Sequence, residues 1–355
     1  PAKHGGFETF AEDLSRFLAQ RGHRVTVYCQ VSPRQQKGED EWNGVHRIFI
    51  PAPDHALGTV QFDWAATKDA SRKEGVILTL GYNTALFNLR CRLKGKRSAI
   101  NMDGLEWKRK KWNTVQRLWL RFNGWAAGRV ADRLIADHPE IARYLQKHTS
   151  ADKITTIPYG AEPVTSASDD VLHHLGLLPK GYYLVIARPE PENSILEIVR
   201  AFSSTPLDAP LIVLGDYSDM SNQYQQLVRR AARPTVRLLG ACYDRSLVRS
   251  LRFYAKAYIH GHQVGGTNPS LVESLAAGNA IIAHDNPFTR WVAGSGALYF
   301  SSQESLLQIF ERVTRRPLEL VAMEKSSRTR YVEYFTQHRI LSQYESLLLD
   351  LADEQ

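Results

Sequence analysis

Apolar residues recur along the chain at two spacings, one typical of helices and the other of buried strands. Phe10, Leu14, Phe17 and Leu18 follow the helical spacing, and the next segment, HRVTVYC (23–29), is a short apolar run rich in Val and Tyr. Because Val and Tyr favour extended structure, this run predicts a buried strand after the first helix. The alternation continues to about residue 300, which predicts parallel sheets with helices on both faces.

The alternation runs through two halves of the chain. In the first half the pattern predicts helices at 113–130 and 139–148 and strands at 45–51, 75–81, 98–104, 132–138 and 153–160. In the second half it predicts helices at 194–202 and 268–278 and strands at 182–188, 209–215, 235–240, 256–261, 279–285 and 296–300. Two such runs predict an α/β protein with two Rossmann-like domains, at 1–162 and 163–327, that face an interdomain cleft.

Composition narrows the class of protein further. The 355 residues are 43% apolar and 23% charged, which suits two globular domains and excludes a disordered or fibrous chain. No apolar run reaches the ~18 residues of a membrane-spanning helix. Cys29, Cys91 and Cys242 form no CxxC pair, which excludes a disulfide framework and a thiolate zinc site. With no signal peptide visible, these features predict a cytoplasmic protein.

Positive charge is concentrated in the first half. Residues 1–162 contain 26 Lys and Arg against 17 Asp and Glu, whereas the remaining residues are nearly neutral. Two clusters dominate, at 90–97 and 108–111, and Trp107, Trp112, Trp119 and Trp125 lie in or near the second. Basic residues mixed with tryptophan suit an anionic membrane surface, although an ordinary solvated face has the same composition. A nucleic-acid surface is not expected, because no helix-turn-helix, zinc-finger or RNP motif accompanies the clusters.

Two glycine pairs precede predicted helices, where backbone N–H groups and the helix dipole favour an anion. Gly5 and Gly6 precede the first helix but lack the GxGxxG pattern, so they are either an anion loop or a turn. The loop GGTNPSL (265–271) adds hydroxyl and amide donors before the helix at 268–278, which would suit a diphosphate.

Charged residues lie beside these loops. Glu273 would repel a phosphate but is suited to accept hydrogen bonds from a ribose diol; the alternative is a carboxylate favoured by the helix dipole. Arg188 ends a predicted strand and could neutralise a leaving diphosphate, or lie on the surface. Asp103 and Glu106 follow the strand at 98–104 and are assigned to the acceptor or sugar, with turn capping as the alternative. His138, His260 and His262 are weaker candidates, and only His262, beside the phosphate loop, is retained.

Four segments together carry a resemblance to a known family. PAKHGGFETFAEDL (1–14), DGLEWKRKKW (103–112), ARPEPENSI (187–195) and HGHQVGGTNPSLVESLAAGNAI (260–281) resemble the bacterial GT4 glycosyltransferases that include β-1,4-L-rhamnosyltransferases of cell-surface polysaccharides. The resemblance implies a GT-B fold and retaining transfer from a nucleotide sugar, with no metal or other cofactor. It also implies a strand before Pro1 that this sequence lacks, and final helices (328–355) that cross back to the first domain.

The resemblance also assigns roles to residues. Gly5 and Gly6 match glycines that face the donor phosphates, Arg188 matches a basic residue on the diphosphate, and Glu273 matches the second Glu of the EX7E motif, which binds the ribose. Two positions depart from the broad pattern, because the first Glu of that motif is Gly265 and the usual phosphate Lys is Asn193.

The donor sugar follows from one further position. A His of many GT4 enzymes, which bonds the 6-hydroxyl of the sugar, is here Met102. A methionine hydrogen-bonds poorly, so a 6-deoxy sugar is expected, and the resemblance implies dTDP-β-L-rhamnose as the donor; packing at a strand end is the alternative.

The resulting site comprises three groups of residues. The expected catalytic residues are Arg188, Glu273 and Asp103, and Asp103 and Glu106 are expected to bind the acceptor. The expected donor-binding residues are Gly5, Gly6, Met102, Arg188, His262, Gly266, Thr267, Asn268, Ser270, Leu271 and Glu273.

Three other functions stay open at this point. They are a GT4 transferase that uses a UDP- or GDP-hexose, a sugar-nucleotide epimerase or phosphorylase on the same fold, and a basic membrane- or nucleic-acid-binding protein without activity. The expected partners are a nucleotide-sugar donor, a lipid-linked saccharide acceptor and the inner face of the plasma membrane, to which residues 90–97 and 108–111 would attach the protein.

Overall fold

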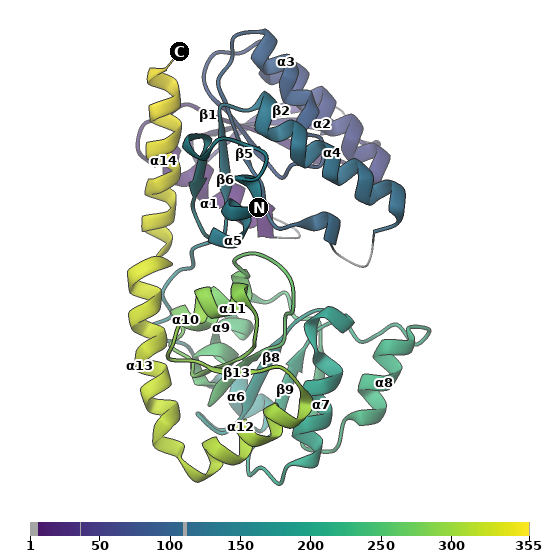
Figure 1. Cartoon of the computed structure of the whole chain (residues 1–355), viewed down its shortest axis with the longest axis vertical. Helices are drawn as coiled ribbons and strands as arrows, with labels where there is room; N and C mark the ends of the chain where they lie inside the picture. Colours follow the sequence, from purple (N-terminus) through teal and green to yellow (C-terminus); the bar gives the residue numbers. More distant parts are fainter. Residues whose placement is uncertain (1–5, 36, 109–111, 355) are drawn as a thin grey trace. The chain divides into compact units, whose positions relative to one another are not determined.

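The computed structural model describes residues 6–35, 37–108 and 112–354. These divide into two compact units: unit 1 is Pro1–Pro158 with Ile340–Gln355, and unit 2 is Tyr159–Arg339 (Figure 1). The return to unit 1 thus begins at Ile340, inside the last helix, rather than at 328. Tyr331 explains the difference, because its hydroxyl donates to the carbonyl of Ala161 at 2.8 Å, and Ala161 also forms an isolated parallel bridge with Thr336. Both contacts keep the end of the preceding helix in unit 2.

Unit 1 contains two sheets. One is three-stranded in the order β1-β3-β2, and the other is four-stranded in the order β4-β5-β6-β7 with all pairs parallel. Its strands are β1 (Val25–Val31), β2 (Gly38–Trp42), β3 (Val45–Pro51), β4 (Ile77–Leu80), β5 (Ser98–Asn101), β6 (Arg133–Ala136) and β7 (Ile154–Thr156). Its helices are α1 (Gly6–Gln20), α2 (Ala56–Ala70), η1 (Ala85–Phe87), α3 (Asn88–Leu93), η2 (Glu106–Lys108), α4 (Thr114–Val130), α5 (Pro139–Leu145), η3 (Ala151–Lys153) and most of α14 (Gln337–Asp353).

Strand β2 is antiparallel to β3 and departs from the expected parallel sheets. Its sequence, GEDEW, is mostly charged, so it lacks the apolar pattern of a strand. The hairpin turn that follows is Asn43-Gly44, both with positive φ (50° and 76°). Asn-Gly is the usual signal of such a two-residue hairpin turn, so the turn residues rather than the strand residues predict this pair.

Unit 2 contains a single six-stranded sheet of parallel strands in the order β10-β9-β8-β11-β12-β13. The strands are β8 (Tyr183–Ile186), β9 (Leu211–Leu214), β10 (Val236–Gly240), β11 (Ala257–His260), β12 (Ile281–His284) and β13 (Leu298–Phe300). The helices are α6 (Asp170–Leu175), η4 (Pro191–Asn193), α7 (Ile195–Ser204), α8 (Gln223–Ala231), α9 (Arg245–Tyr254), α10 (Pro269–Ala276), α11 (Pro287–Ala293), α12 (Gln303–Arg315) and α13 (Pro317–Tyr334).

Two apolar clusters cover the unit-2 sheet, which explains why its strands read as continuous apolar runs. One is centred on Phe202 and Phe310 and the other on Tyr258 and Leu275. Every strand and helix range predicted from the apolar pattern overlaps an element of the expected type. Among the described residues, no helix combines the length and the apolar character that a membrane span requires.

Candidate functional site

The loops after β8 and β11 are joined by hydrogen bonds. The two strands pair in parallel, so their carboxyl ends lie side by side. The backbone N–H of Gln263 donates to the carbonyl of Glu192 at 2.9 Å, and the hydroxyl of Ser194 donates to the carbonyl of Gly261 at 2.8 Å. A Cβ on Gly261 would lie 2.2 Å from the carbonyl oxygen of Asn193, so this close approach requires glycine. Two of the loops predicted from the sequence thus form one connected surface in unit 2.

Arg188 begins the first of these loops with an accessible cation. Its side chain is 63% exposed, and its Nη1 lies 3.9 Å from a carboxylate oxygen of Glu190. The loop itself is fixed by Asn193, which is buried and donates from its side chain to the carbonyl of Arg188 at 2.9 Å. Asn193 therefore shapes the backbone beneath Arg188, while the guanidinium itself stays accessible to an anion.

The amides at the start of α10 are less available than the sequence suggests. The side chain of Asn268 caps the helix and accepts from the N–H of Ser270 at 3.0 Å, and the N–H of Leu271 donates to the carbonyl of Asn268 at 3.1 Å. The expectation that backbone donors throughout 266–271 face a diphosphate is therefore wrong for these two amides. Leu271 is also buried, as is Thr267.

Glu273 is held by a residue that the sequence analysis missed. Arg252, on α9, is buried and places Nη2 2.5 Å from a carboxylate oxygen of Glu273 and 2.9 Å from the hydroxyl of Ser270. The hydroxyls of Ser270 and Tyr258 are also 2.9 Å apart. Glu273 keeps 44% of its side chain exposed, so a fixed carboxylate faces solvent one turn into α10. Nothing in the local pattern of α9 marks Arg252, because its partners are on other elements.

Gly265 adopts a backbone conformation that explains its identity. Its φ is +144°, a region that side-chain-bearing L-residues rarely enter. The position at which the resembled motif has its first Glu is thus suited to glycine in this chain, and a carboxylate there would require a different loop conformation.

Two stacked histidines follow β11. The rings of His260 and His262 are 4.3 Å apart and nearly parallel. His260 is 1% exposed and neither ring nitrogen has a hydrogen-bond partner. Burial lowers the pKa of His260 well below the usual value, and the neighbouring His262 and His284 lower it further. His260 is therefore neutral at pH 7. The retained candidate, His262, is linked through its backbone instead, since its carbonyl accepts from Asn286 at 3.0 Å.

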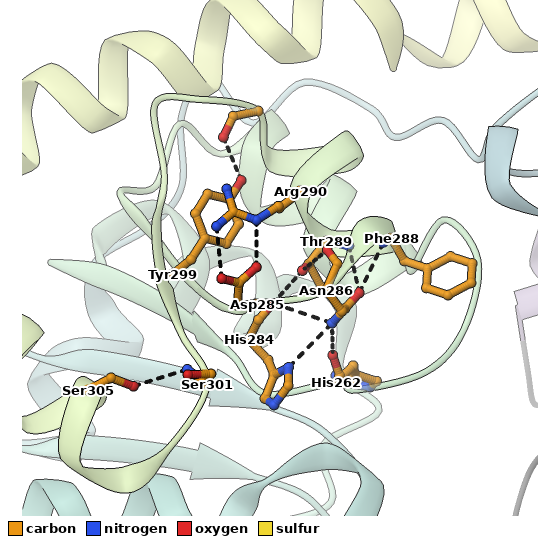
Figure 2. A network of polar contacts seen from close by, with 11 residues as sticks. His262, His284, Asp285, Asn286, Phe288, Thr289, Arg290, Tyr299, Ser301 and Ser305 are labelled. Atoms are coloured by element: carbon orange, nitrogen blue, oxygen red, sulfur yellow. Dashed lines mark hydrogen bonds and ion pairs between the residues drawn. The ribbon is translucent and has the colours of Figure 1, made fainter.

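Asn286 organises the loop after β12, as Figure 2 shows. Its side-chain oxygen accepts from the N–H groups of Phe288 and Thr289 at 3.0 and 3.1 Å, and its amide group also approaches His284. Beside it, Arg290 and Asp285 form an ion pair at 2.5 Å, and this hydrogen-bonded partner lowers the pKa of Asp285. The loops after β11 and β12 are thereby tied together.

A small pocket lies between these loops. Its volume of about 10 Å³ is close to that of a single water site and far below the several hundred Å³ of a ligand pocket. The lining residues are His260, His262, Val264, Gly266, Asn268, Leu271, Asn286, Phe288, Thr289 and Val292. Several predicted donor residues are thus brought together in unit 2, but they do not enclose a sugar there.

In unit 1, Asp103 follows β5 in a strained conformation. Its φ is +46°, unusual for a residue other than glycine. The side-chain oxygen of Asn101 accepts from its N–H at 2.8 Å, and the Asn101 amide donates to the hydroxyl of Tyr344 at 2.6 Å. Tyr344 lies on α14, and its burial raises the pKa of the phenol, which stays protonated. Asn101 and Tyr344 were not predicted; only the positive φ, which sequence does not reveal, marks this region.

The other predicted residues of unit 1 are placed as follows. Met102 is 3% exposed and its N–H donates to Ile135, as expected for packing at a strand end. Glu106 begins η2 and accepts from the indole of Trp112 at 3.3 Å. His138 caps α5 by accepting from Glu140. Gly6 begins α1, whereas Gly5 lies outside the described residues.

The basic cluster at 90–97 is partly engaged within unit 1. Arg90 donates to Ser71, Arg97 pairs with Asp132 at 2.8 Å, and Arg92 donates to the backbone of Arg129. In the second cluster, 109–111 lie outside the described residues. In the described ranges, no group of three or more His, Cys, Asp or Glu side chains is arranged to bind a metal ion.

Comparison of the sequence with known families gives a match in the first half of the chain. The profile of a family described as a domain of unknown function, DUF1972, matches residues 1–162. No curated protein matches the sequence.

Similar solved structures cover almost the whole chain. A sucrose-phosphate synthase from Thermosynechococcus elongatus has a TM-score of 0.84 at 17% identity, covering 99% of this chain and 94% of its own. HepE from Anabaena, in complex with UDP, has a TM-score of 0.78 at 14% identity, covering 99% and 98%. A glycosyltransferase from Rickettsia africae has a TM-score of 0.73 at 12% identity, covering 99% and 96%. The chain therefore has the GT-B fold, with two Rossmann-like domains, as the sequence predicts.

Proposed function

We propose that this protein is a glycosyltransferase that takes its sugar from a nucleoside-diphosphate sugar. The observation that carries the proposal is the connected surface at the carboxyl ends of β8 and β11. There, the accessible cation of Arg188 follows β8, and the fixed carboxylate of Glu273 lies in α10, the helix after the loop that follows the neighbouring strand β11. A guanidinium suits a diphosphate and a carboxylate suits a ribose diol. HepE, of the same fold, has been solved with UDP and with UDP-glucose.

Each residue has a distinct role in this proposal. Arg188 binds the diphosphate and stabilises the negative charge that grows on it as the glycosidic bond breaks. Glu273 accepts hydrogen bonds from the ribose, and Arg252 holds its carboxylate in place. Amides of residues 266–268, ahead of the capped turn of α10, contribute to the phosphate contacts.

The reaction we propose retains the anomeric configuration. The acceptor hydroxyl attacks the anomeric carbon on the face from which the diphosphate departs. A carbon–oxygen bond to the acceptor forms, the bond to the phosphate oxygen breaks, and that oxygen takes the hydroxyl proton. The protein then contributes positioning and charge stabilisation rather than a covalent nucleophile. Asp103, and Glu106 beside it, are assigned to the acceptor.

The donor we propose is dTDP-β-L-rhamnose. The residue type at position 102 supports it, because a methionine where the resembled enzymes have a His would offer no partner to a 6-hydroxyl. Gly265 supports it as well, because the loop has no carboxylate at the position where the resembled enzymes have one. The second candidate is a UDP-hexose, which the HepE complex with UDP-glucose favours.

The acceptor we propose is a lipid-linked saccharide of bacterial surface polysaccharide synthesis. An acceptor of this kind lies at the cytoplasmic face of the plasma membrane, where anionic lipids attract basic proteins. The excess of positive charge in residues 1–162, including the clusters at 90–97 and 108–111, suits that surface. The protein would then be cytoplasmic and peripherally bound to the membrane.

A direct assay tests these proposals. The full chain is incubated with dTDP-L-rhamnose, UDP-glucose or GDP-mannose and a polyprenyl-diphosphate-linked saccharide, and products are identified by mass spectrometry and NMR. We expect transfer from dTDP-L-rhamnose with retained configuration and roughly 10-fold or greater discrimination against the hexoses, because a buried 6-hydroxyl lacks a partner. Faster transfer from UDP-glucose would show that the proposed donor is wrong but would still support a glycosyltransferase. Isomerisation of the nucleotide sugar without transfer would contradict the class.

A further inference from the structure

Helix α4 of unit 1 exposes a continuous stripe of large apolar side chains. The stripe consists of Val115 (75% exposed), Leu118 (61%), Trp119 (43%), Phe122 (46%) and Trp125 (47%). These positions recur at intervals of three and four residues, so they share one side of the helix. The other side packs into unit 1 through Leu120, Asn123, Ala127 and Val130. The helix is thus apolar on two sides, and only one of these sides packs against the rest of unit 1.

The exposed side chains are held in position. The indole N–H of Trp119 donates to the carbonyl of Asn83 at 2.9 Å, so its polar atom is already bonded while the ring stays exposed. Phe122 and Trp125 stack at 6.1 Å, and the guanidinium of Arg129 lies 4.1 Å from the centre of the Trp125 ring. A capping box between Asn113 and Gln116 fixes the start of the helix. Because these side chains are already held in position, they lose little conformational entropy when they contact a partner surface.

The charge of the surrounding surface identifies the occupant. The sequence of α4, TVQRLWLRFNGWAAGRV, contains arginines at 117, 121 and 129 and no acidic residue. Helix α3 packs beside α4 (Figure 1) and exposes Leu93 between two basic residues. A second copy of this face would bring like charges together, whereas an anionic bilayer satisfies both the cations and the apolar stripe.

We propose that the outer face of α4 enters the headgroup region of an anionic membrane and anchors unit 1 there. Tryptophan and phenylalanine would lie at the boundary between headgroups and acyl chains, and the arginines would bind lipid phosphates. This contact differs from electrostatic attraction by the basic clusters alone, because the apolar part persists when salt screens the charges. The proposal does not depend on the transfer reaction.

Vesicle sedimentation of the full chain tests the anchor. The probes are vesicles of phosphatidylcholine alone and of phosphatidylcholine with phosphatidylglycerol, at low and at high salt. We expect binding to the anionic vesicles that high salt weakens but does not abolish. The variant Leu118→Ser/Phe122→Ser should bind at least about tenfold more weakly, since two apolar side chains no longer enter the interface.

A matched variant distinguishes binding through this stripe from non-specific binding through any exposed leucine. Leu178→Ser/Leu318→Ser removes two leucines of unit 2 that are at least as exposed, and it should bind like the parent protein. Circular dichroism and melting temperature establish that both variants fold. Equal binding by the Leu118→Ser/Phe122→Ser variant, or equal loss in the control, would overturn the proposal.

Two further readouts decide between occupants. Lipids brominated on the acyl chain should quench tryptophan fluorescence in the parent protein, and Trp119→Phe/Trp125→Phe should remove most of that quenching. Light scattering without vesicles should report a monomer at all concentrations. A concentration-dependent dimer that Leu118→Ser/Phe122→Ser abolishes would identify a second copy as the occupant and overturn the membrane anchor. Because no turnover is measured, failure here leaves the proposed transferase unaffected, and the reverse holds as well.

Discussion

The connected loops of unit 2 and the carboxyl end of the β4–β7 sheet in unit 1 both present polar groups, but they are built differently. In unit 2, side-chain caps from Asn193 and Asn268 fix each loop internally, and bonds of Ser194 to Gly261 and of Gln263 to Glu192 join the two loops at neighbouring strand ends of one sheet. In unit 1, Asp103 depends on Asn101 and, through it, on Tyr344, which is 243 residues further along the chain than Asn101. A ligand surface whose loops belong to one sheet thus contrasts with one that needs the last helix of the chain.

The difference indicates which changes each surface tolerates. The unit-2 loops contain Gly261 at a close approach to Asn193 and Gly265 at positive φ, so their shape is fixed by residues of the two loops themselves. The conformation of Asp103 is strained, and the buried hydrogen-bonded pair of Asn101 and Tyr344 supports it, so it should respond to a substitution far away in sequence. Substitutions in unit 2 should therefore affect the donor, and substitutions in the network of unit 1 should affect the acceptor.

The largest effect is expected from Arg188→Ala. Because charge on the diphosphate grows in the transition state, kcat should fall about 100-fold or more, with a smaller rise in the donor KM. Arg188→Lys should recover only part of the rate, since it lacks the bidentate fork. Steady-state kinetics measure both parameters, with Arg200→Ala, an exposed arginine of α7, as the control. A rise in KM at unchanged kcat would restrict Arg188 to ground-state binding.

A smaller effect, confined to the acceptor, is expected from Tyr344→Phe. Loss of the hydrogen bond to Asn101 should loosen Asp103 and lower kcat/KM for the acceptor about tenfold, with the affinity for the donor unchanged. Tyr28→Phe is the matched control, because it removes a hydrogen bond to Asp69 elsewhere in unit 1. If Tyr344→Phe weakens donor and acceptor equally, the two surfaces do not have the separate roles argued above.

The smallest effect concerns pH and the buried His260. The unfolded chain binds a proton at this residue below a pH of about 6.5, whereas the folded protein does so only at much lower pH. The unfolded state therefore binds more protons in this window, and the free energy of unfolding should fall by up to about 1.4 kcal/mol per pH unit as the pH drops below about 6.5. Above about pH 6.5, His260 is neutral in both states, so it no longer lowers the free energy of unfolding.

Substitution of His260 should remove this pH dependence. At pH 7, the free energy of unfolding of His260→Leu should equal or slightly exceed that of the parent protein, because no hydrogen bond is lost. Between pH 6.5 and 5, its free energy of unfolding should fall less steeply than that of the parent protein. Chemical denaturation at several pH values measures the slope, and His174→Leu, at an exposed position of α6, is the control. An identical slope in parent and His260→Leu would show that the histidine is protonated or accessible in the folded state.

The periodicity of apolar residues was sufficient to predict the parallel sheets and most elements, because buried strands and amphipathic helices have strong local patterns. It missed β2, whose residues are charged and whose pairing is specified by the turn at Asn43-Gly44. The boundary between units also shifted, since the bonds between Ala161 and the 331–336 segment are long-range and leave no local signal.

For the candidate site, the sequence identified residues near strand ends but not their partners. Glu273 and Arg188 were predicted as charged groups at strand or helix ends, whereas Arg252 and Tyr344 reach the site from elements distant in the chain. Local reasoning also overestimated the free amides of α10, because the side chain of Asn268, which the sequence marks as a cap as well as a donor ligand, accepts from the N–H of Ser270. Contacts of this kind depend on tertiary packing and cannot be read from spacing.

The most direct test of the account is calorimetric titration of the full chain with dTDP and with UDP. We expect one nucleoside diphosphate per chain. Arg188→Ala and Glu273→Ala should each weaken binding roughly tenfold or more through the loss of charge-assisted hydrogen bonds, with folding checked by melting temperature. Tyr344→Phe should bind like the parent protein. Absence of binding, or equal affinity in the parent, Arg188→Ala and Glu273→Ala proteins, would contradict a donor site in unit 2.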